Sequence, residues 1–161
     1  MRLTLTITIV LLTVLASAVA WSRSFSRSAN IHRPFAQVYA SMSNYFSPNS
    51  LRDFQIVSMN KNRSKAELVA KRTVQDQLKW TNWAYCKVPT LRLFDSLQQG
   101  DITVRMKLDR EGADRTFVTV RAEFQGIYQF AGNSRVQQCS SNGALEKDIL
   151  RAAGASDGNF D

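Results

Sequence analysis

The sequence predicts an α+β domain in which a curved antiparallel sheet packs on two amphipathic helices. Apolar residues recur at helical spacing directly after Pro34 and again between Leu145 and Ala153. Between these two segments, much of the chain from residue 54 to residue 130 alternates apolar and polar side chains with a period of two. A helix, a series of strands and a closing helix form the element order of a sheet that covers helices with one face.

An uncharged apolar run begins at Leu3 and ends at Ala20. It is typical of a signal peptide, because the small residues at 16–18 and at 18–20 both fit an A-x-A cleavage pattern. The run is also long enough for a membrane anchor, with Trp21 at the interface position. The first interpretation predicts an extracytoplasmic protein, periplasmic or secreted. The second predicts a single-pass membrane-anchored protein.

The remainder of the 161-residue chain has the length of one domain. We expect residues 1–20 to be the signal peptide or anchor, 21–31 a linker or first strand, 32–154 the folded domain and 155–161 a disordered tail. The formal net charge is +8. Such a charge attracts a protein to anionic surfaces, among which a membrane ranks above nucleic acid for an exported chain, although it also aids solubility alone.

Both predicted helices show one apolar stripe. Pro34 suits a first helical turn because it lacks an N–H donor and fixes φ. Apolar side chains then follow at helical spacing, at Phe35, Val38, Tyr39, Met42 and Tyr45. On one face the closing helix carries Leu145, Ile149 and Ala152. Gly143 and Glu146 resemble a weak capping box before it, and Gly154 is the expected C-cap.

The clearest strands are the two halves of a predicted hairpin. From Ile102 to Leu108 four apolar residues alternate with four polar ones through Asp109, and Val118 to Phe124 repeats this pattern after a polar loop. Such alternation predicts antiparallel strands with one dry and one wet face. We also expect a chain turn at residues 98–101 and a β-bulge at Gly126.

Aromatic residues gather between the predicted strands, at Trp80, Trp83, Tyr85 and Phe94. Large amphipathic rings on a sheet could line an apolar ligand pocket or lie in a membrane interface, and plain core packing explains them equally simply. Basic residues surround one predicted turn, at Lys61, Arg63, Lys65, Lys71 and Arg72. They suit contact with anionic headgroups or a solvated surface.

Cys86 and Cys139 are the two cysteines of the chain. In an oxidising compartment an even pair favours a disulfide, and two separate thiols are the alternative. The sequence has no C-x-x-C motif and no Cys/His cluster, so it predicts no zinc site.

No catalytic signature is convincing. A Gly-x-Ser-x-Gly match at residues 154–158 lacks the strand before the serine that a nucleophile elbow requires. His32, the single histidine, suits a surface or capping position beside Pro34. We therefore predict a protein that is not an enzyme and needs no cofactor.

The segment Ile31–Ala40, IHRPFAQVYA, preceded by a short polar strand and followed by a meandering sheet and a closing helix, resembles the START/Bet v 1-like helix-grip superfamily, which includes polyketide cyclase-like and lipid-transport-like proteins. The resemblance covers residues 24–154. It implies a cavity for lipids or other apolar ligands between the sheet and the closing helix. We expect the cavity to be lined by Trp80, Trp83, Tyr85, Val104, Met106, Val120 and Phe124. The closing helix is shorter than in the superfamily, which puts a large cavity in question.

Two functions follow. The first is a non-catalytic module, exported or anchored in a membrane, that binds an apolar, lipid-like small molecule. The second is a cavity-free structural or assembly module of the cell envelope that acts through contacts with another envelope protein.

Overall fold

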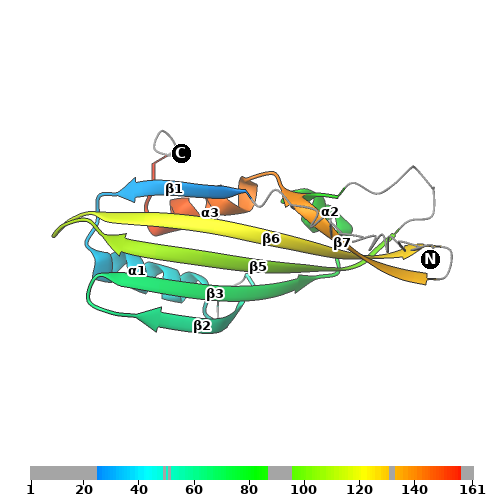
Figure 1. Ribbon diagram of the computed structural model, residues 1–161, viewed down its shortest axis with the longest axis horizontal. Helices are drawn as coiled ribbons and strands as arrows, with labels where there is room; N and C mark the ends of the chain where they lie inside the picture. Colours follow the sequence, from blue (N-terminus) through cyan, green and yellow to red (C-terminus); the bar gives the residue numbers. More distant parts are fainter. Residues whose placement is uncertain (1–24, 49, 51, 87–95, 131–132, 157–161) are drawn as a thin grey trace, which may run out of the picture.

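The computed structural model describes residues 25–48, 50, 52–86, 96–130 and 133–156 (Figure 1). Within these ranges the chain is an α+β fold, as expected, with seven strands in one antiparallel sheet and three short helices. The elements are, in order, β1 (Ser26–Ile31), α1 (Phe35–Tyr45), β2 (Gln55–Lys61), β3 (Lys65–Val74), α2 (Gln77–Thr81), β4 (Ala84–Tyr85), β5 (Ser96–Arg110), β6 (Thr116–Phe130), β7 (Asn133–Ser141) and α3 (Ala144–Ala153). The predicted leader, residues 1–20, lies outside the described residues, as do residues 157–161 of the predicted tail. Among the described helices, none is long and apolar enough to cross a membrane.

The hairpin of β5 and β6 runs through the centre of the sheet. On one side β5 pairs with β3, and β3 pairs with β2. The other side of β6 is divided, because β1 pairs with residues 116–121 and β7 with residues 124–130. We call residues 102–110 and 116–124 the helix-covered half of the hairpin. Residues 96–101 and 125–130, with residues 133–138 of β7, form the arm, which projects beyond α1 and α3 in Figure 1.

The register of the hairpin confirms the alternation predicted from the sequence. Ile102 pairs with Phe124, Val104 with Ala122 and Leu108 with Val118. All six side chains are at most 1% exposed. The residues between them, such as Arg105 and Lys107, lie on the opposite, exposed face. One face is therefore dry and the other wet.

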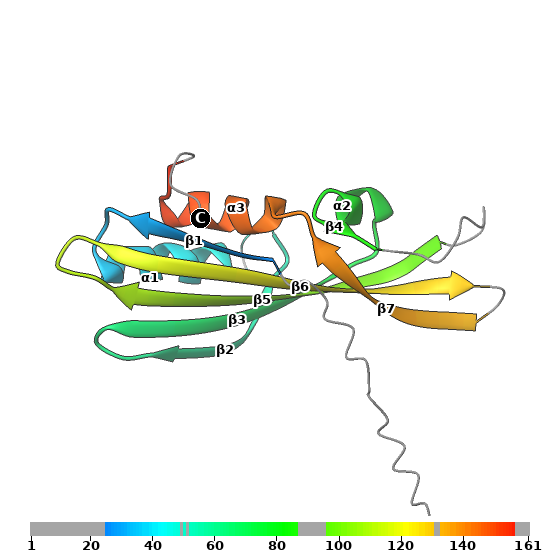
Figure 2. The same ribbon diagram turned by 45° about the horizontal axis from the view of Figure 1, so that its top comes forward.

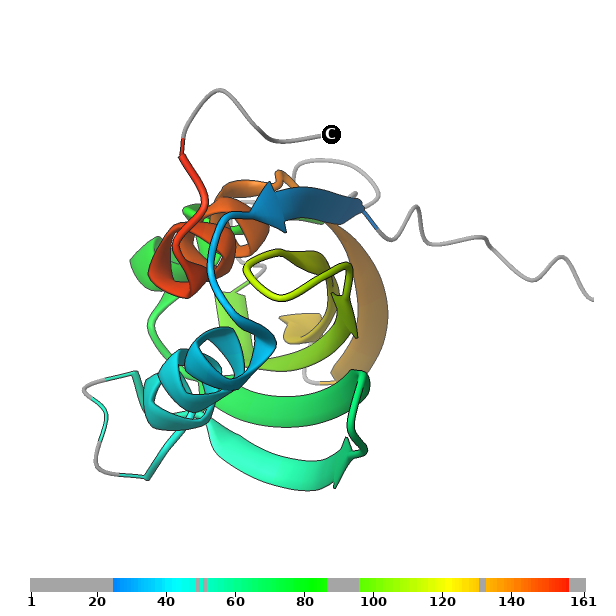
Figure 3. The same ribbon diagram turned by 90° about the vertical axis from the view of Figure 1, so that its left-hand side faces the viewer.

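Two helices cover the dry face, which is the concave side of the curved sheet (Figures 2 and 3). The helix α1 follows Pro34 and buries the predicted stripe at Phe35, Val38, Met42 and Tyr45. The helix α3 packs on β1, β6 and α1, and it buries Leu145, Ile149, Leu150 and Ala153. It ends at Gly154, whose φ of 108° is the left-handed C-cap conformation predicted for it.

Two predictions about turns are wrong. Residues 98–101 do not turn the chain but lie inside β5, which continues from Ser96 to Arg110. Gly126 is not a bulge, because it pairs in register with Gly100, and the register shift lies in β5 between Leu97 and Gln99. The glycine and glutamines suggested a turn locally, but strand pairing with β6 and β3 overrides that preference.

Candidate functional site

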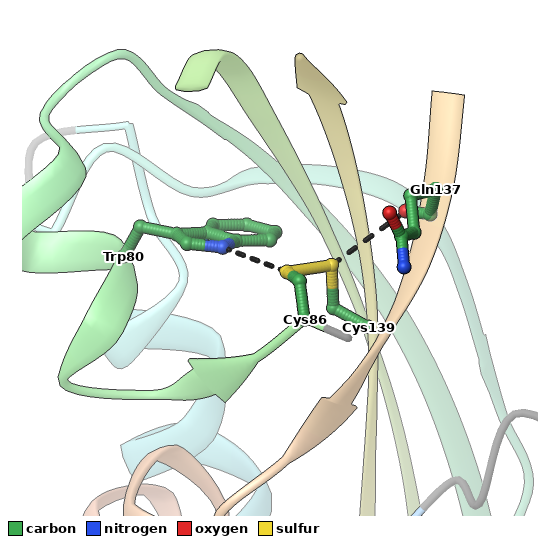
Figure 4. Close-up of a disulfide and its surroundings, with 4 residues drawn as sticks. All are labelled: Trp80, Cys86, Gln137 and Cys139. Carbon is green, nitrogen blue, oxygen red and sulfur yellow. Dashed lines mark hydrogen bonds between the residues drawn. A yellow bond between two sulfur atoms is a disulfide. The ribbon is translucent and has the colours of Figure 1, made fainter. Parts of the chain in front are cut away.

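A short segment, residues 76–86, crosses the concave face from the end of β3 to β7, and we call it the strap (Figure 4). It contains the five-residue helix α2 and the two-residue strand β4. The side chain of Asp76 accepts the Lys79 N–H at 3.3 Å and so caps α2. A single helical turn is unstable alone, so contacts with the sheet must hold the strap in place. Trp80 lies on this helix.

Trp80 anchors the strap and is 1% exposed. Its ring lies so close to Gly100 that a Cβ added there would overlap the indole carbons. Phe124 meets the indole edge-to-face, with 5.5 Å between the ring centroids. On the paired strand, the ring of Tyr128 lies over Gly126, where an added Cβ would be 2.6 Å from Cε2. The two paired glycines thus form a recess that Trp80 and Tyr128 fill.

A disulfide ties the end of the strap to the sheet. Cys86 is bonded to Cys139 of β7, and their Cα atoms are 4.3 Å apart. The Trp80 Nε1–H donates to Cys86 Sγ at 3.3 Å, so the indole and the disulfide share one contact (Figure 4). Cys139 Sγ lies 3.6 Å from the Gln137 carbonyl oxygen. This second contact is not a hydrogen bond, because a disulfide sulfur carries no proton.

Polar contacts add to this attachment. Asn142 donates twice to the strap, from its N–H to the Trp83 carbonyl at 3.0 Å and from Nδ2 to the Asn82 carbonyl at 2.8 Å. Two residue pairs join β4 to β7. The strap, which covers one end of the concave face, is therefore attached to the sheet by Trp80, by the disulfide and by these bonds.

The structure brings together only some of the residues predicted to bind a ligand. Trp80, Phe124 and the two cysteines meet at the strap. Trp83 is half-buried, with the Arg72 guanidinium 5.4 Å from its ring centroid. Tyr85 is 64% exposed and lies apart from this cluster. Phe94 lies outside the described residues.

The other predicted cavity residues lie in the helix-covered half. Val104, Met106 and Val120 are completely buried and belong to one continuous hydrophobic core with α1 and α3. Buried side chains of both helices, such as Met42 and Ile149, belong to the same core. Sequence reasoning missed the residues that receive the strap: Gly100 lies against Trp80, Gly126 lies against Tyr128, and Asn142 donates to the Asn82 and Trp83 carbonyls. The two glycines in facing strands were the available signal, since a glycine inside a strand often marks a close approach.

The basic residues predicted around one turn are divided by the fold. Lys65 forms an ion pair with Asp109 at 3.5 Å, and Arg72 with Asp53 at 3.6 Å. Lys61 and Arg63 instead join Arg110 around an open depression of about 280 Å³ at the hairpin ends, beside Pro34. No carboxylate lines this depression. It is the position where the described surface best suits an anion.

One buried carboxylate stands out. Glu146 of α3 is completely buried; Ser141 Oγ donates to its Oε2 at 2.8 Å, and its Oε1 has no protein partner. Burial raises the pKa of Glu146, whereas the Ser141 hydrogen bond and the nearby Arg27 lower it. The predicted capping box is wrong, because Glu146 points into the protein and Ser141, rather than Glu146, accepts the Gly143 N–H.

The two residues considered for catalysis, His32 and Ser156, both lie on the surface. His32 is exposed in the turn before α1. Ser156 follows α3 and is exposed, and part of its Gly-x-Ser-x-Gly match lies outside the described residues. Within the described part of the chain, no group of three or more His, Cys, Asp or Glu side chains could hold a metal ion.

Comparison with known proteins adds no relative: no protein-family model, no curated protein and no solved structure matches this chain. Its function must therefore be inferred from its own residues.

Proposed function

We propose that this protein is a non-catalytic, cavity-free module of the cell envelope that acts through contacts with another protein. The observation that carries this proposal is the filled concave face. Val104, Met106, Val120 and Phe124, the residues expected to line a ligand cavity, are completely buried within one core. A close-packed interior leaves surface contacts as the means of action.

The outer face of the arm is the surface best suited to such a contact. Val136 is 63% exposed there and pairs with Ile127 across the strands. Next to the arm, Tyr85 of β4 is 64% exposed and pairs with Ser140 of β7. Their neighbours on that face are Gln99, Gln125, Gln138 and Ser140, with one charged residue, Asp101, which accepts a hydrogen bond from Gln99 Nε2 at 3.0 Å. Protein interfaces are depleted in charge and enriched in tyrosine at their centres, and this surface has that composition.

The outer face of the helix-covered half differs. It carries Arg105, Lys107, Arg121, Glu67 and Glu123, and Arg121 lies 3.2 Å from Glu123 in an ion pair. Such a mixed-charge surface is typical of a solvated sheet face. The contrast supports the arm as the contact surface.

The compartment proposed is extracytoplasmic, periplasmic or secreted, or else the surface of a membrane to which the leader anchors the domain. The apolar run at Leu3–Ala20 and the Cys86–Cys139 disulfide support it together. Disulfides persist mainly outside the reducing cytosol. An anionic membrane surface is a secondary partner, supported by the depression at Lys61, Arg63 and Arg110.

A lipid-like ligand in a helix-grip fold is the second candidate. The two helices on the concave side of an antiparallel sheet support that resemblance. The recess filled by Trp80 is the one feature that favours an apolar ligand, because its occupant is a single side chain on a short segment.

Photocrosslinking in cells tests the first proposal. We expect a photoreactive amino acid at position 136 to give one reproducible protein adduct and the same group at position 105, in the charged surface, to give none. Equal adducts at both positions, or no adduct at position 136, would contradict it. Native mass spectrometry of the protein purified from the same cells separates the two candidates, because a co-purifying lipid supports the second.

A further inference from the structure

We propose that the strap is a redox-latched lid over an apolar binding site, and that this site takes a flat, uncharged ligand once the Cys86–Cys139 bond is reduced. This goes beyond the proposed function, which concerns the closed, disulfide-bonded form. The site is the recess floored by Gly100 and Gly126. Its lid is the segment that bears Trp80.

The side chain that fills the recess shows what the recess accepts. The indole of Trp80 is a flat bicyclic ring that lies against the Gly100 backbone and is 1% exposed. Phe124 presents its edge to it at 5.5 Å. Leu97 and Tyr128 approach Gly126 in the adjoining part of the recess. The walls are aromatic and aliphatic, so a ligand of similar shape without charge would replace the indole with little loss of contact.

Apart from its covalent bond, the lid is held by the buried ring of Trp80 and by short elements. The helix α2 has five residues and cannot hold itself together, and β4 contributes two residue pairs. Two hydrogen bonds from Asn142 tie residues 82 and 83 to the sheet side. The disulfide at Cys86 fixes the far end of the strap, so its cleavage removes the tie that prevents the whole segment from swinging away.

A dithiol reductant of the thioredoxin type supplies the electrons that reduce the Cys86–Cys139 disulfide. Its thiolate attacks Sγ of Cys86, which is half-buried, whereas Cys139 is 3% exposed. The Cys86–Cys139 bond breaks, a mixed disulfide forms and Cys139 leaves as a thiolate. The second thiol of the reductant then displaces Cys86. Two electrons and two protons pass to the cysteine pair, and the reductant becomes a disulfide.

Opening also removes a contact that holds the indole. Trp80 Nε1–H donates to Cys86 Sγ, so displacement of Cys86 from β7 weakens the position of the ring. The strap then pivots at the end of β3, and Phe124, Leu97 and Gly100 face the emptied recess.

Probe binding tests the lid. The full-length protein as cells produce it is titrated with N-phenyl-1-naphthylamine, an uncharged apolar fluorophore, before and after reduction by a dithiol. We expect at least tenfold tighter binding after reduction, and the same tight binding without reductant in the double variant Cys86→Ala/Cys139→Ala. Equal binding in both states would overturn the proposal.

A matched glycine pair locates the site. In the cysteine-free background, Gly100→Leu fills the recess and should abolish probe binding. Gly112→Leu, in the open hairpin loop, should leave probe binding unchanged, because the only atom near an added Cβ there is a carboxylate oxygen of Asp114 at 3.9 Å. Tight binding that survives Gly100→Leu would place the probe elsewhere and overturn the proposal.

Hydrogen exchange shows whether opening is local. The amides of Trp80, bonded to the Asp76 carbonyl, and of Asn142, bonded to the Trp83 carbonyl, should exchange at least tenfold faster after reduction. The amide of Lys147, bonded to the Gly143 carbonyl in α3, should not change. Acceleration of all three amides together would mean that reduction unfolds the domain, and the lid would be refuted.

Discussion

The two halves of the β5–β6 hairpin are built by the same pair of strands but are stabilised differently. In the helix-covered half, large aliphatic side chains such as Met106 and Val120 pack directly against α1 and α3. In the arm, the corresponding inward positions include Gly100 and Gly126, which contribute no side chain. The cover there is a five-residue helix with one tryptophan, tied down by a disulfide.

The two halves show two ways to exclude water from one face of a sheet. The first buries continuous apolar area between elements long enough to be amphipathic, and its stability comes from packing. The second uses one large ring and one covalent bond, and its stability depends on both. A segment of the second kind can be released without dismantling the first, which is the basis of the lid proposed above.

The largest effect is expected in the core of the helix-covered half. Met106 is completely buried, and Met106→Ala should lower the free energy of unfolding by about 2–5 kcal/mol, through lost burial and a cavity. Its neighbour Lys107 points to the exposed face, and Lys107→Ala should change stability by about 0.5 kcal/mol or less. Urea unfolding of both variants measures this contrast. Equal losses would mean that the two faces are not distinguished by burial.

The disulfide should be the next largest contributor. Cys86 and Cys139 are separated by 53 residues along the chain, and their loop contains all of β5 and β6. Cys86→Ala/Cys139→Ala should therefore lower the free energy of unfolding by about 2–4 kcal/mol, because the unfolded chain gains freedom. Urea unfolding without reductant gives the value. A loss below about 1 kcal/mol would show that the non-covalent contacts of the strap, rather than the disulfide, hold it on the arm.

How much of this could be predicted from the sequence also differs between the halves. In the helix-covered half, the alternation of side chains from Ile102 to Leu108 predicted the strands, their buried face and the core. The prediction succeeds because every second side chain is apolar and every second side chain is buried there. In the arm, Gly100 and the glutamines around it looked like a turn, and the pattern failed. Gly100 is a strand residue because it pairs with Val74 and Gly126, and it is a glycine because the ring of Trp80, twenty positions earlier, leaves no room for a Cβ. No local pattern contains these contacts.

The residues of the candidate site also differ in how much of their arrangement the sequence predicts. Trp80 and Phe124 could be selected as large aromatic residues, but their meeting depends on the fold. Tyr85 looked equivalent to Trp80 in sequence and is exposed, because neighbouring residues of β4 point to opposite faces. Cys86 meets Cys139 because β4 pairs with β7. The two residues of β4 are too few to predict this pairing from the sequence.

A smaller effect is expected at the glycine floor of the arm. Gly100→Val introduces atoms where the indole of Trp80 lies, so the ring must move, and stability should fall by about 1–3 kcal/mol. Gly112→Ala, at the open turn of the same hairpin, is the matched control and should be close to neutral. Thermal unfolding of the two variants under oxidising conditions measures the difference. A neutral Gly100→Val would mean that the close contact with Trp80 does not exist in solution.

The smallest effect is a pH dependence from Glu146, the buried carboxylate among the apolar contacts of α3. Burial raises its pKa in the folded state above the value in the unfolded chain. The folded protein therefore holds this proton more tightly, and the contribution of Glu146 to stability falls as pH rises from the usual carboxyl range through the raised pKa. The groups facing the carboxylate are Arg27 from β1 and Ser141 from β7, which both lower its pKa and so oppose the effect.

Glu146→Gln removes the titration, so the free energy of unfolding of wild type minus that of the variant should decrease between about pH 4 and about pH 8. Ser141→Ala should make this decrease steeper, because the hydroxyl that donates to Oε2 at 2.8 Å no longer favours the charged form. Urea unfolding across this pH range measures both slopes. A difference that increases with pH would mean that the hydrogen bonds to the carboxylate, together with Arg27, outweigh burial at Glu146. The charged form of Glu146 would then be the form that the folded protein favours.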